Sequence, residues 1–153
     1  MNTPYPMLWF DDQAEQAAEL YTSLISDSEI TAIERYPADV PGRTAGEVMT
    51  VAFTLGGARF SALNGGPDHY KFSEAFSLVV ECQDQEEIDR LWNALTADGG
   101  APSMCGWLVD RFGFSWQIIP ENLGDLIRHP AAMEAMLAMT KIDIAALEGA
   151  AAA

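Results

Sequence analysis

One amide side chain stands out because most of its neighbours are apolar. Gln117 lies in the segment 114–119, whose side chains fall into two alternating sets: Ser115, Gln117 and Ile119 against Trp116 and Ile118. In a β-strand, such alternation sends the two sets to opposite faces. Both sets contain apolar bulk, which indicates a strand covered on both faces. A polar amide in such surroundings needs hydrogen-bond partners, from the protein or from a ligand.

A thiol and an imidazole are the side chains that could support nucleophilic chemistry. Cys105 precedes Trp107 by two positions, at the predicted mouth of a strand. A nucleophilic thiolate needs a nearby base or cation, and the second half of the chain offers Arg111 and His129. The alternative is that Cys105 is a small hydrophobic side chain in the interior. His69 lies in a predicted connection, where an imidazole is usually solvated.

Aromatic side chains and a glycine turn could complete a ligand site. Trp9 and Trp107 could offer flat apolar walls to a ligand. Alternation sends Trp116 to the face opposite Gln117, which favours packing under a helix. The run Asn-Gly-Gly-Pro at 64–67 could present backbone N–H groups to an anion, or could be only a turn.

The composition limits the classes of partner. The 153 residues suffice for one domain, or for two small half-domains that share a core. The formal net charge of −15 would be repelled by phosphate backbones and by anionic lipids, so we expect neither nucleic acid nor a membrane as a partner. Two cysteines make no disulfide framework, and residues 1–4 lack the basic start of a signal peptide. We therefore expect a cytoplasmic protein.

Local patterns predict short strands and amphipathic helices. The predicted strands are 5–10, 29–36, 48–55, 58–63, 76–82, 104–109 and 114–119. The predicted helices are 13–26, 85–97, 123–128, 131–140 and 142–147, and residues 149–153 are expected to fray. Asp11 or Asp12 is expected to cap the first helix, and Asp84 the second.

The order of these elements indicates an internal duplication. One self-alignment places residues 9–24 over 80–95, and another places Phe60 on Phe114. Together, in this order, the two matches favour two tandem βαβββ modules and an α+β fold. The alternative, a single ferredoxin-like sheet, would explain the first βαβ segment but not the later hairpins.

The predicted domain organisation follows from this duplication. We expect one domain at 1–153, with module one at about 4–67, module two at about 74–120 and a helical tail at about 121–148. In each module, one helix covers one face of a small sheet. Two such sheets can close into a trough that holds a ligand.

Several sequence phrases carry a resemblance to a known family. They are Leu-Trp-Phe-Asp at 8–11, Ala-Leu-Asn-Gly-Gly-Pro at 62–67, Lys-Phe at 71–72, Cys-Gly-Trp-Leu at 105–108, Ser-Trp-Gln-Ile at 115–118 and Met-Thr-Lys-Ile-Asp-Ile-Ala-Ala-Leu at 139–147. With the order of elements, they resemble the vicinal oxygen chelate superfamily of glyoxalases, extradiol dioxygenases and bleomycin-resistance proteins. The chain looks most similar to its PhnB-like branch, sometimes labelled 3-demethylubiquinone 3-methyltransferase. The sequence gives methyl transfer no support, because no glycine-rich loop follows a parallel strand.

The resemblance implies where a divalent ion would lie, because superfamily enzymes typically hold it with His or Glu from four strands. The four positions fall near 6–8, at Leu63 or Asn64, between 75 and 77, and on Gln117. None of them holds an imidazole or a carboxylate, and Glu74 lies just outside the third. We therefore predict neither a metal nor another cofactor.

These expectations define one preferred function and two alternatives. The preferred one is metal-free binding of a small organic molecule in the trough, through Trp9, Asn64, Ser77, Cys105, Trp107 and Gln117. The first alternative is a lyase, isomerase or dioxygenase, with a metal held by unusual ligands such as Glu74 or with Cys105 or His69 as a metal-free catalytic group. The second is an interaction module with a self-filled trough. The resemblance also implies a homodimer, because superfamily members with short modules often share edges between subunits.

Overall fold

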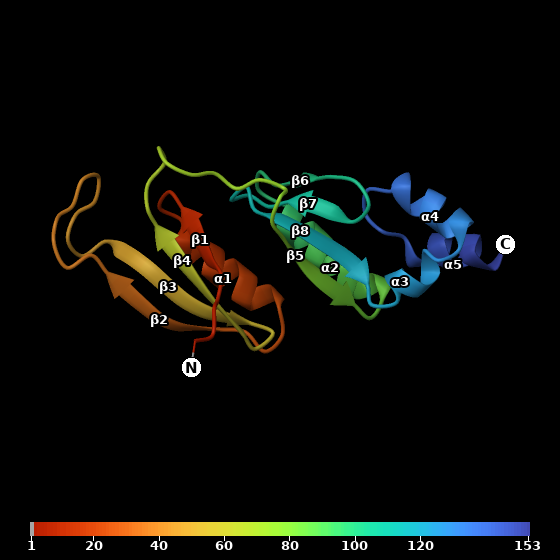
Figure 1. The fold of residues 1–153 in the computed structure, drawn as a ribbon, viewed down its shortest axis with the longest axis horizontal. Coiled ribbons are helices and arrows are strands. Elements are labelled where there is room, and N and C mark those ends of the chain that lie inside the picture. The colour runs from red at the N-terminus through yellow and green to blue at the C-terminus, as the bar shows by residue number, and fades with distance from the viewer. Residues whose placement is uncertain (1) are drawn as a thin grey trace. The chain divides into compact units, whose positions relative to one another are not determined.

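The structure is a computed structural model that describes residues 2–153, so the first residue of the predicted 1–153 domain lies outside it (Figure 1). The described chain forms two compact units that divide between Lys71 and Phe72. Each unit contains one open four-stranded mixed sheet and the element order βαβββ. The predicted α+β fold of two glyoxalase-like modules with a helical C-terminal segment is thus confirmed.

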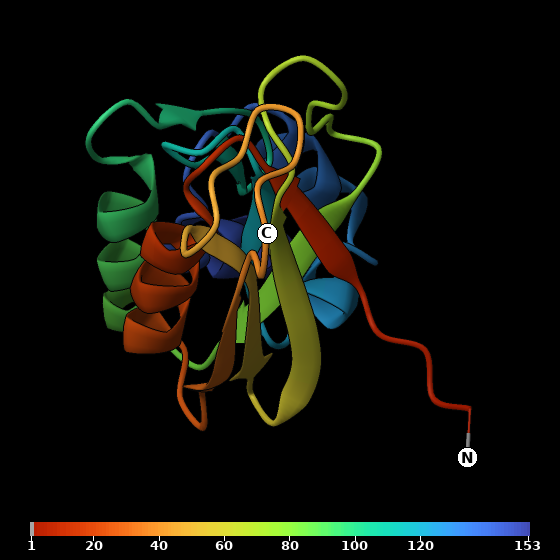
Figure 2. The same cartoon turned by 90° about the vertical axis from the view of Figure 1, so that its left-hand side faces the viewer.

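The first unit has one face of its sheet covered by a helix. Its elements are β1 (Met7–Phe10), α1 (Ala14–Leu24), β2 (Glu29–Arg35), β3 (Val48–Leu55) and β4 (Ala58–Asn64). The sheet order is β1-β4-β3-β2, with β1 parallel to β4 and the other neighbours antiparallel. Figure 2 shows α1 to one side of these strands. The buried side chains that form this core include Leu8, Phe10, Ala17, Tyr21, Val51, Phe53, Phe60 and Ala62.

The second unit repeats this arrangement. Its elements are β5 (Ser77–Cys82), α2 (Gln85–Thr96), β6 (Ala101–Pro102), β7 (Trp107–Val109) and β8 (Ser115–Pro120). The sheet order is β5-β8-β7-β6, and β5 is parallel to β8. Its core includes Ile88, Leu91, Leu95, Leu108, Trp116 and Ile118, all at most 1 % exposed. Burial of each such side chain contributes about 1.5–3 kcal/mol to folding.

The strand predicted at 104–109 begins three residues later than expected, at Trp107. Cys105 and Gly106 adopt φ angles of 59° and 84°, in the left-handed region that interrupts a strand. Their N–H groups donate to the carbonyl oxygens of Met139 and Thr140, at 2.9 and 2.8 Å. These two residues thus bond to the C-terminal segment instead of to a neighbouring strand. Local sequence patterns do not reveal this pairing.

Three further helices form the C-terminal segment: α3 (Leu123–Leu126), α4 (Pro130–Leu137) and α5 (Ile144–Ala152) (Figure 1). Residues 149–153 were expected to fray, but α5 continues to Ala152. Asp143 caps this helix, because its carboxylate accepts from the N–H of Ala146 at 3.0 Å. Among residues 2–153, no helix is long and apolar enough to cross a membrane.

The start of α2 holds the C-terminal segment through side chains. The amide of Gln85 donates to the carbonyl oxygen of Ile142 and accepts from the N–H of Ile144, both at 2.9 Å. Lys141 lies 2.8 Å from Asp89, and its hydrogen bond, together with that from Gln85, lowers the pKa of Asp89. The side chain of Ile142 is fully buried. One glutamine therefore clamps both ends of a short backbone stretch.

Replacing Gln85 by alanine is expected to loosen this clamp. Two hydrogen bonds to backbone groups are lost, so the free energy of unfolding should fall by about 1–2 kcal/mol. Hydrogen exchange at Ile144 should accelerate more than exchange at Leu91 in the core of α2. Gln83→Ala is the matched control, because the side chain of Gln83 is exposed. Equal exchange at Ile144 in the two variants would show that the clamp contributes nothing.

Candidate functional site

The second sheet has one face under α2 and one face that is partly open. In the antiparallel pair β7–β8, Trp107 is opposite Gln117, and in the parallel pair β5–β8, Val79 is opposite Gln117. Paired residues point to the same face, so these three side chains form one row. Gln117 and Trp107 are half-buried and Val79 is 50 % exposed, whereas Trp116 on the other face is buried. The full covering predicted for β8 is therefore present on one face only.

Two predicted contact residues meet on this open face. The side-chain Nε2 of Gln117 donates to the Oγ of Ser77 at 3.0 Å. Ser77 is the first residue of β5, and both side chains are half-buried. The parallel pairing of β5 with β8 brings them together although they are 40 positions apart. This polar pair, Trp107 and Val79 together are called the open-face site below.

Trp9 lies on the open face of the first sheet, paired in register with Leu63. Its indole N–H donates to the carbonyl oxygen of Gly66 at 3.0 Å. A Cβ atom at Gly65 would lie 2.2 Å from the indole ring, so the ring packs directly on the glycine backbone. The ring of Tyr70 meets it edge-on, with centroids 4.9 Å apart. Trp9 is thus held by the glycine turn, a packing role that its sequence position did not indicate.

Asn64 faces α1 rather than the open face of its sheet. Its side-chain oxygen accepts from the N–H of Ala14 at 2.8 Å, and its amide nitrogen donates to the carbonyl oxygen of Val48 at 3.1 Å. Asn64 therefore accepts the hydrogen bond of a backbone N–H in the first turn of α1. The sequence predicted this capping role for Asp11 or Asp12. Alternation leaves Leu63, the other candidate at the end of β4, on the open face.

The glycine run after β4 is a structural turn. The N–H groups of Gly65 and Gly66 donate to the carbonyl oxygens of Phe10 and Asp11, at 2.9 and 3.1 Å. Both donors that could have held an anion are thus already used. Of the two readings that the sequence left open, the structure supports the turn.

The two thiols differ in burial. Burial raises the pKa of Cys82 to about 12, so this side chain stays protonated at neutral pH. Cys105 is half-buried in the loop before β7. The guanidinium of Arg111 lies 3.2 Å from Asp98 and donates to the carbonyl oxygen of Ala94 at 3.4 Å. It is therefore engaged at the C-terminal end of α2 and is no evident partner for a thiolate.

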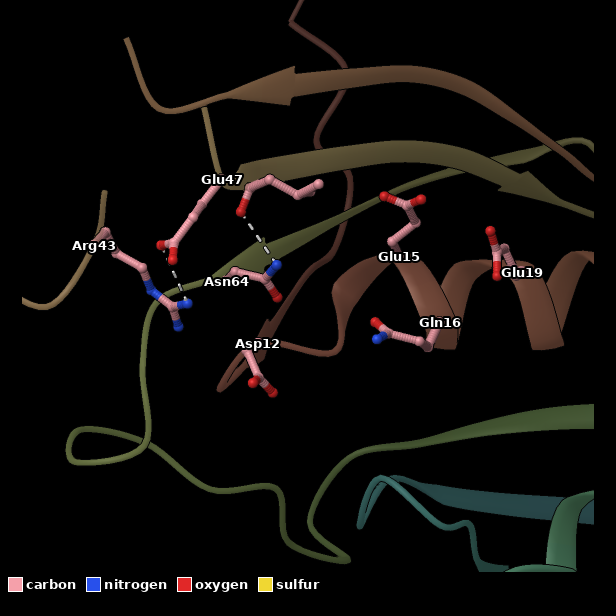
Figure 3. Close-up of a pocket in the computed structure, with 8 residues that line it drawn as sticks. Asp12, Glu15, Gln16, Glu19, Arg43, Glu47 and Asn64 are labelled. Atoms are coloured by element: carbon pink, nitrogen blue, oxygen red, sulfur yellow. Dashed lines mark hydrogen bonds and ion pairs between the residues drawn. The ribbon is translucent and has the colours of Figure 1, made fainter. Parts of the chain in front are cut away.

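A cavity of about 490 Å³ lies elsewhere, beside the start of α1 (Figure 3). Its lining residues are Asp12, Glu15, Gln16, Glu19, Arg43, Glu47, Val48 and Asn64. Arg43 lies 3.9 Å from Glu47, and the buried amide of Asn64 is occupied by the fold. Figure 3 shows the carboxylates of α1 and Glu47 around this space. A cavity with so many carboxylates would repel anions, and it contains none of the aromatic residues predicted to line the site.

The open-face positions do not fit a divalent ion. Of the ion positions expected from the sequence, Met7 and Leu63 lie on the open face of the first sheet, and Ser77 and Gln117 lie on the open face of the second. These side chains supply a thioether, a hydrocarbon, a hydroxyl and an amide, without an anionic ligand. Within residues 2–153, no group of three or more His, Cys, Asp or Glu side chains is placed to hold a metal.

The two βαβββ modules give the chain the glyoxalase-like fold of the vicinal oxygen chelate superfamily. A family model described as 3-demethylubiquinone-9 3-methyltransferase matches residues 2–119. The chain therefore belongs to this PhnB-like family. No curated protein sequence matches the chain.

One solved structure supports this family assignment, and two others share the fold. A PhnB protein from Bacillus cereus that carries the same methyltransferase description is 35 % identical, with a TM-score of 0.69 over 77 % of this chain and 99 % of that one. Protein PA1353 from Pseudomonas aeruginosa is 22 % identical, with a TM-score of 0.62 over 78 % and 98 %. The fosfomycin resistance protein FosX from Listeria monocytogenes, in a complex with Mn(II), is 16 % identical, with a TM-score of 0.52 over 76 % and 89 %.

The methyltransferase description of the family names a reaction that needs a methyl donor. A nucleotide-like donor would be held by free backbone N–H groups in a glycine-rich turn. The turn at Gly65 and Gly66 has its N–H groups bonded to β1 and the residue after it, and the ring of Trp9 fills the space above it. This turn therefore does not fit such a donor.

Proposed function

We propose that the chain binds a small organic molecule at the open-face site of its second sheet, without a divalent ion. The observation that carries this proposal is the half-buried Ser77–Gln117 hydrogen bond beside Trp107. On a half-open, mostly apolar face, a polar pair can orient a bound ligand through hydrogen bonds. The indole of Trp107 then gives the ligand an apolar contact area.

The energetics of the pair favour a ligand that can form hydrogen bonds. Covering the amide of Gln117 with a purely apolar molecule would strip it of water and cost about 1–3 kcal/mol. A ligand that replaces those bonds avoids this cost while it covers Trp107 and Val79. The site therefore favours a ligand that has polar groups next to Gln117 and apolar surface over Trp107 and Val79.

The metal-free part of the proposal rests on the residues at the family's ion positions. Neither Met7 and Leu63 in the first unit nor Ser77 and Gln117 in the second supply an anionic ligand, so a cation at either sheet would gain no charge neutralisation. We therefore assign the polar contacts to hydrogen bonds with the ligand itself.

Gln117→Leu is expected to weaken ligand binding by about tenfold, equal to about 1.4 kcal/mol, because one well-placed hydrogen bond is lost. Ligands are first identified as molecules that raise the melting temperature, in a panel of planar metabolites with and without EDTA. Isothermal titration of the hits then gives the dissociation constants.

Gln83→Leu is the matched control, because this exposed glutamine lies outside the sheet. The proposal predicts unchanged binding in this control and in EDTA. Unchanged binding in Gln117→Leu would remove Gln117 from the site. Binding that disappears in EDTA and returns with a divalent ion would overturn the metal-free mode.

A further inference from the structure

The Ser77–Gln117 pair has a defined residual hydrogen-bonding capacity. The hydroxyl oxygen of Ser77 accepts from Nε2 of Gln117 at 3.0 Å, so its own hydrogen is left to donate elsewhere. The side-chain oxygen Oε1 of Gln117 is an acceptor attached to the same amide. The pair therefore offers a hydroxyl donor and a carbonyl acceptor side by side, in addition to the second N–H of the amide.

This pattern does not depend on the orientation of the amide. If the amide is rotated by 180°, Oε1 accepts from the Ser77 hydroxyl and Nε2 points outward as a donor. The hydroxyl oxygen then provides the free acceptor. Both orientations leave at least one donor and one acceptor for a ligand.

We propose that the open-face site is selective for a planar molecule with an N–H donor and a C=O acceptor on one edge, as in a lactam or a cyclic imide. This inference rests on the proposed function and specifies its ligand class. In the first orientation the ligand C=O accepts from the Ser77 hydroxyl and the ligand N–H donates to Oε1 of Gln117, and in the rotated orientation the two contacts exchange residues. The two residues and the ligand edge then close a ring of hydrogen bonds, in which each bond polarises the next.

The side chains around the pair match a flat ring system. Trp107 and Val79 are the cross-strand neighbours of Gln117 on either side, and neighbouring strands lie about 4.8 Å apart. A planar ligand whose polar edge meets Gln117 can thus place apolar surface on both neighbours. The indole of Trp107 gives the larger contact and favours aromatic rings.

The charges around the site favour a neutral ligand over an anion. Alternation along β5 places Glu81 on the same face as Ser77 and Val79, and the whole chain has a formal net charge of −15. The Ser77–Gln117 pair has no positive charge to offset this field. A carboxylate would therefore bind less well than a lactam of the same shape.

Three bicyclic probes of similar shape test this inference on the full chain: 2-quinolone, N-methyl-2-quinolone and quinoline-2-carboxylate. Dissociation constants are measured by isothermal titration and by quenching of tryptophan fluorescence. We expect 2-quinolone to bind at least about tenfold more tightly than either analogue, because each analogue leaves part of the polar pair unmatched. In Gln117→Leu and in Ser77→Ala this preference should fall to about one, while Gln83→Leu should keep it.

The outcomes separate this inference from the proposed function. If all three probes bind equally and Trp107→Ala weakens them together, the site binds small molecules but the ligand class is wrong. Tightest binding of the carboxylate would also overturn the ligand class. If no probe binds and the metabolite panel gives no hits, both proposals fail.

Discussion

Asp110→Ala is expected to lower the free energy of unfolding by about 4 kcal/mol, because it leaves buried donors without an acceptor. Asp110 is 2 % exposed, in the turn between β7 and β8. One carboxylate oxygen accepts from the N–H groups of Phe112 and Phe114, at 2.8 and 3.0 Å. The other accepts from the indole N–H of Trp116 at 2.9 Å. Thermal unfolding should show a fall in melting temperature on the order of 10 °C.

Two further variants make this prediction specific. Asp110→Asn can keep an oxygen toward the two backbone N–H groups but turns an NH₂ group toward the N–H of Trp116, so it should be destabilised less than the alanine variant. Adding Trp116→Phe removes that donor–donor conflict, and the double variant should lose less than the sum of the two single losses. Asp125→Ala is the control, because its carboxylate is 77 % exposed and its pair with Arg128 is worth little. A loss at Asp110 no larger than at Asp125 would contradict the assigned role.

Gly106→Ala is expected to lower the free energy of unfolding by about 3 kcal/mol. The added Cβ would lie 2.8 Å from the carbonyl oxygen of Ile118 and 3.0 Å from the side chain of Ile142. Relief of these contacts requires movement of the backbone next to Trp107, so ligand binding at the open-face site should weaken as well. Urea titration measures the stability loss, and the same ligand titrations measure the affinity.

Gly113→Ala provides a close control for the backbone contribution. Gly113 has φ of 85° against 84° for Gly106, but a Cβ there would have no heavy atom within 4 Å. The left-handed conformation should cost both variants about 1 kcal/mol. The difference between them, about 2 kcal/mol, then measures the close packing at Gly106. Equal losses would mean that the loop before β7 adapts freely.

Local periodicity predicted most of the helices and strands, and the internal duplication predicted their arrangement in two βαβββ modules. Strand β3 was predicted with its exact bounds, and the cap of α2 was predicted correctly, because the carboxylate of Asp84 accepts from the N–H of Glu87 at 2.9 Å. Both follow from patterns within a few residues. The late start of β7 could not be predicted, because it depends on bonds from Cys105 and Gly106 to a segment more than thirty positions away.

The candidate site was partly predictable for the same reason. Alternation placed Gln117 and Trp116 on opposite faces, as found, and Ser77 proved to be the hydrogen-bond partner of Gln117. The role of Asn64 was not predictable from local sequence. The polarity of Asn64 indicated a ligand-binding residue. Its hydrogen-bond partner is instead the backbone N–H of Ala14 at the start of α1, which lies 50 residues earlier in the sequence. Such pairings depend on strand register, which becomes known only when the sheet is assembled.

The bond between Asn64 and the N–H of Ala14 has a consequence for folding kinetics. The first turn of α1 lacks a side-chain acceptor of its own, and it gains one only when β4 has docked beside β1. Helix nucleation in the first unit is therefore coupled to the closure of a long loop, which slows folding relative to a helix that is capped locally. A peptide limited to the first strand and helix would have little helical content in water.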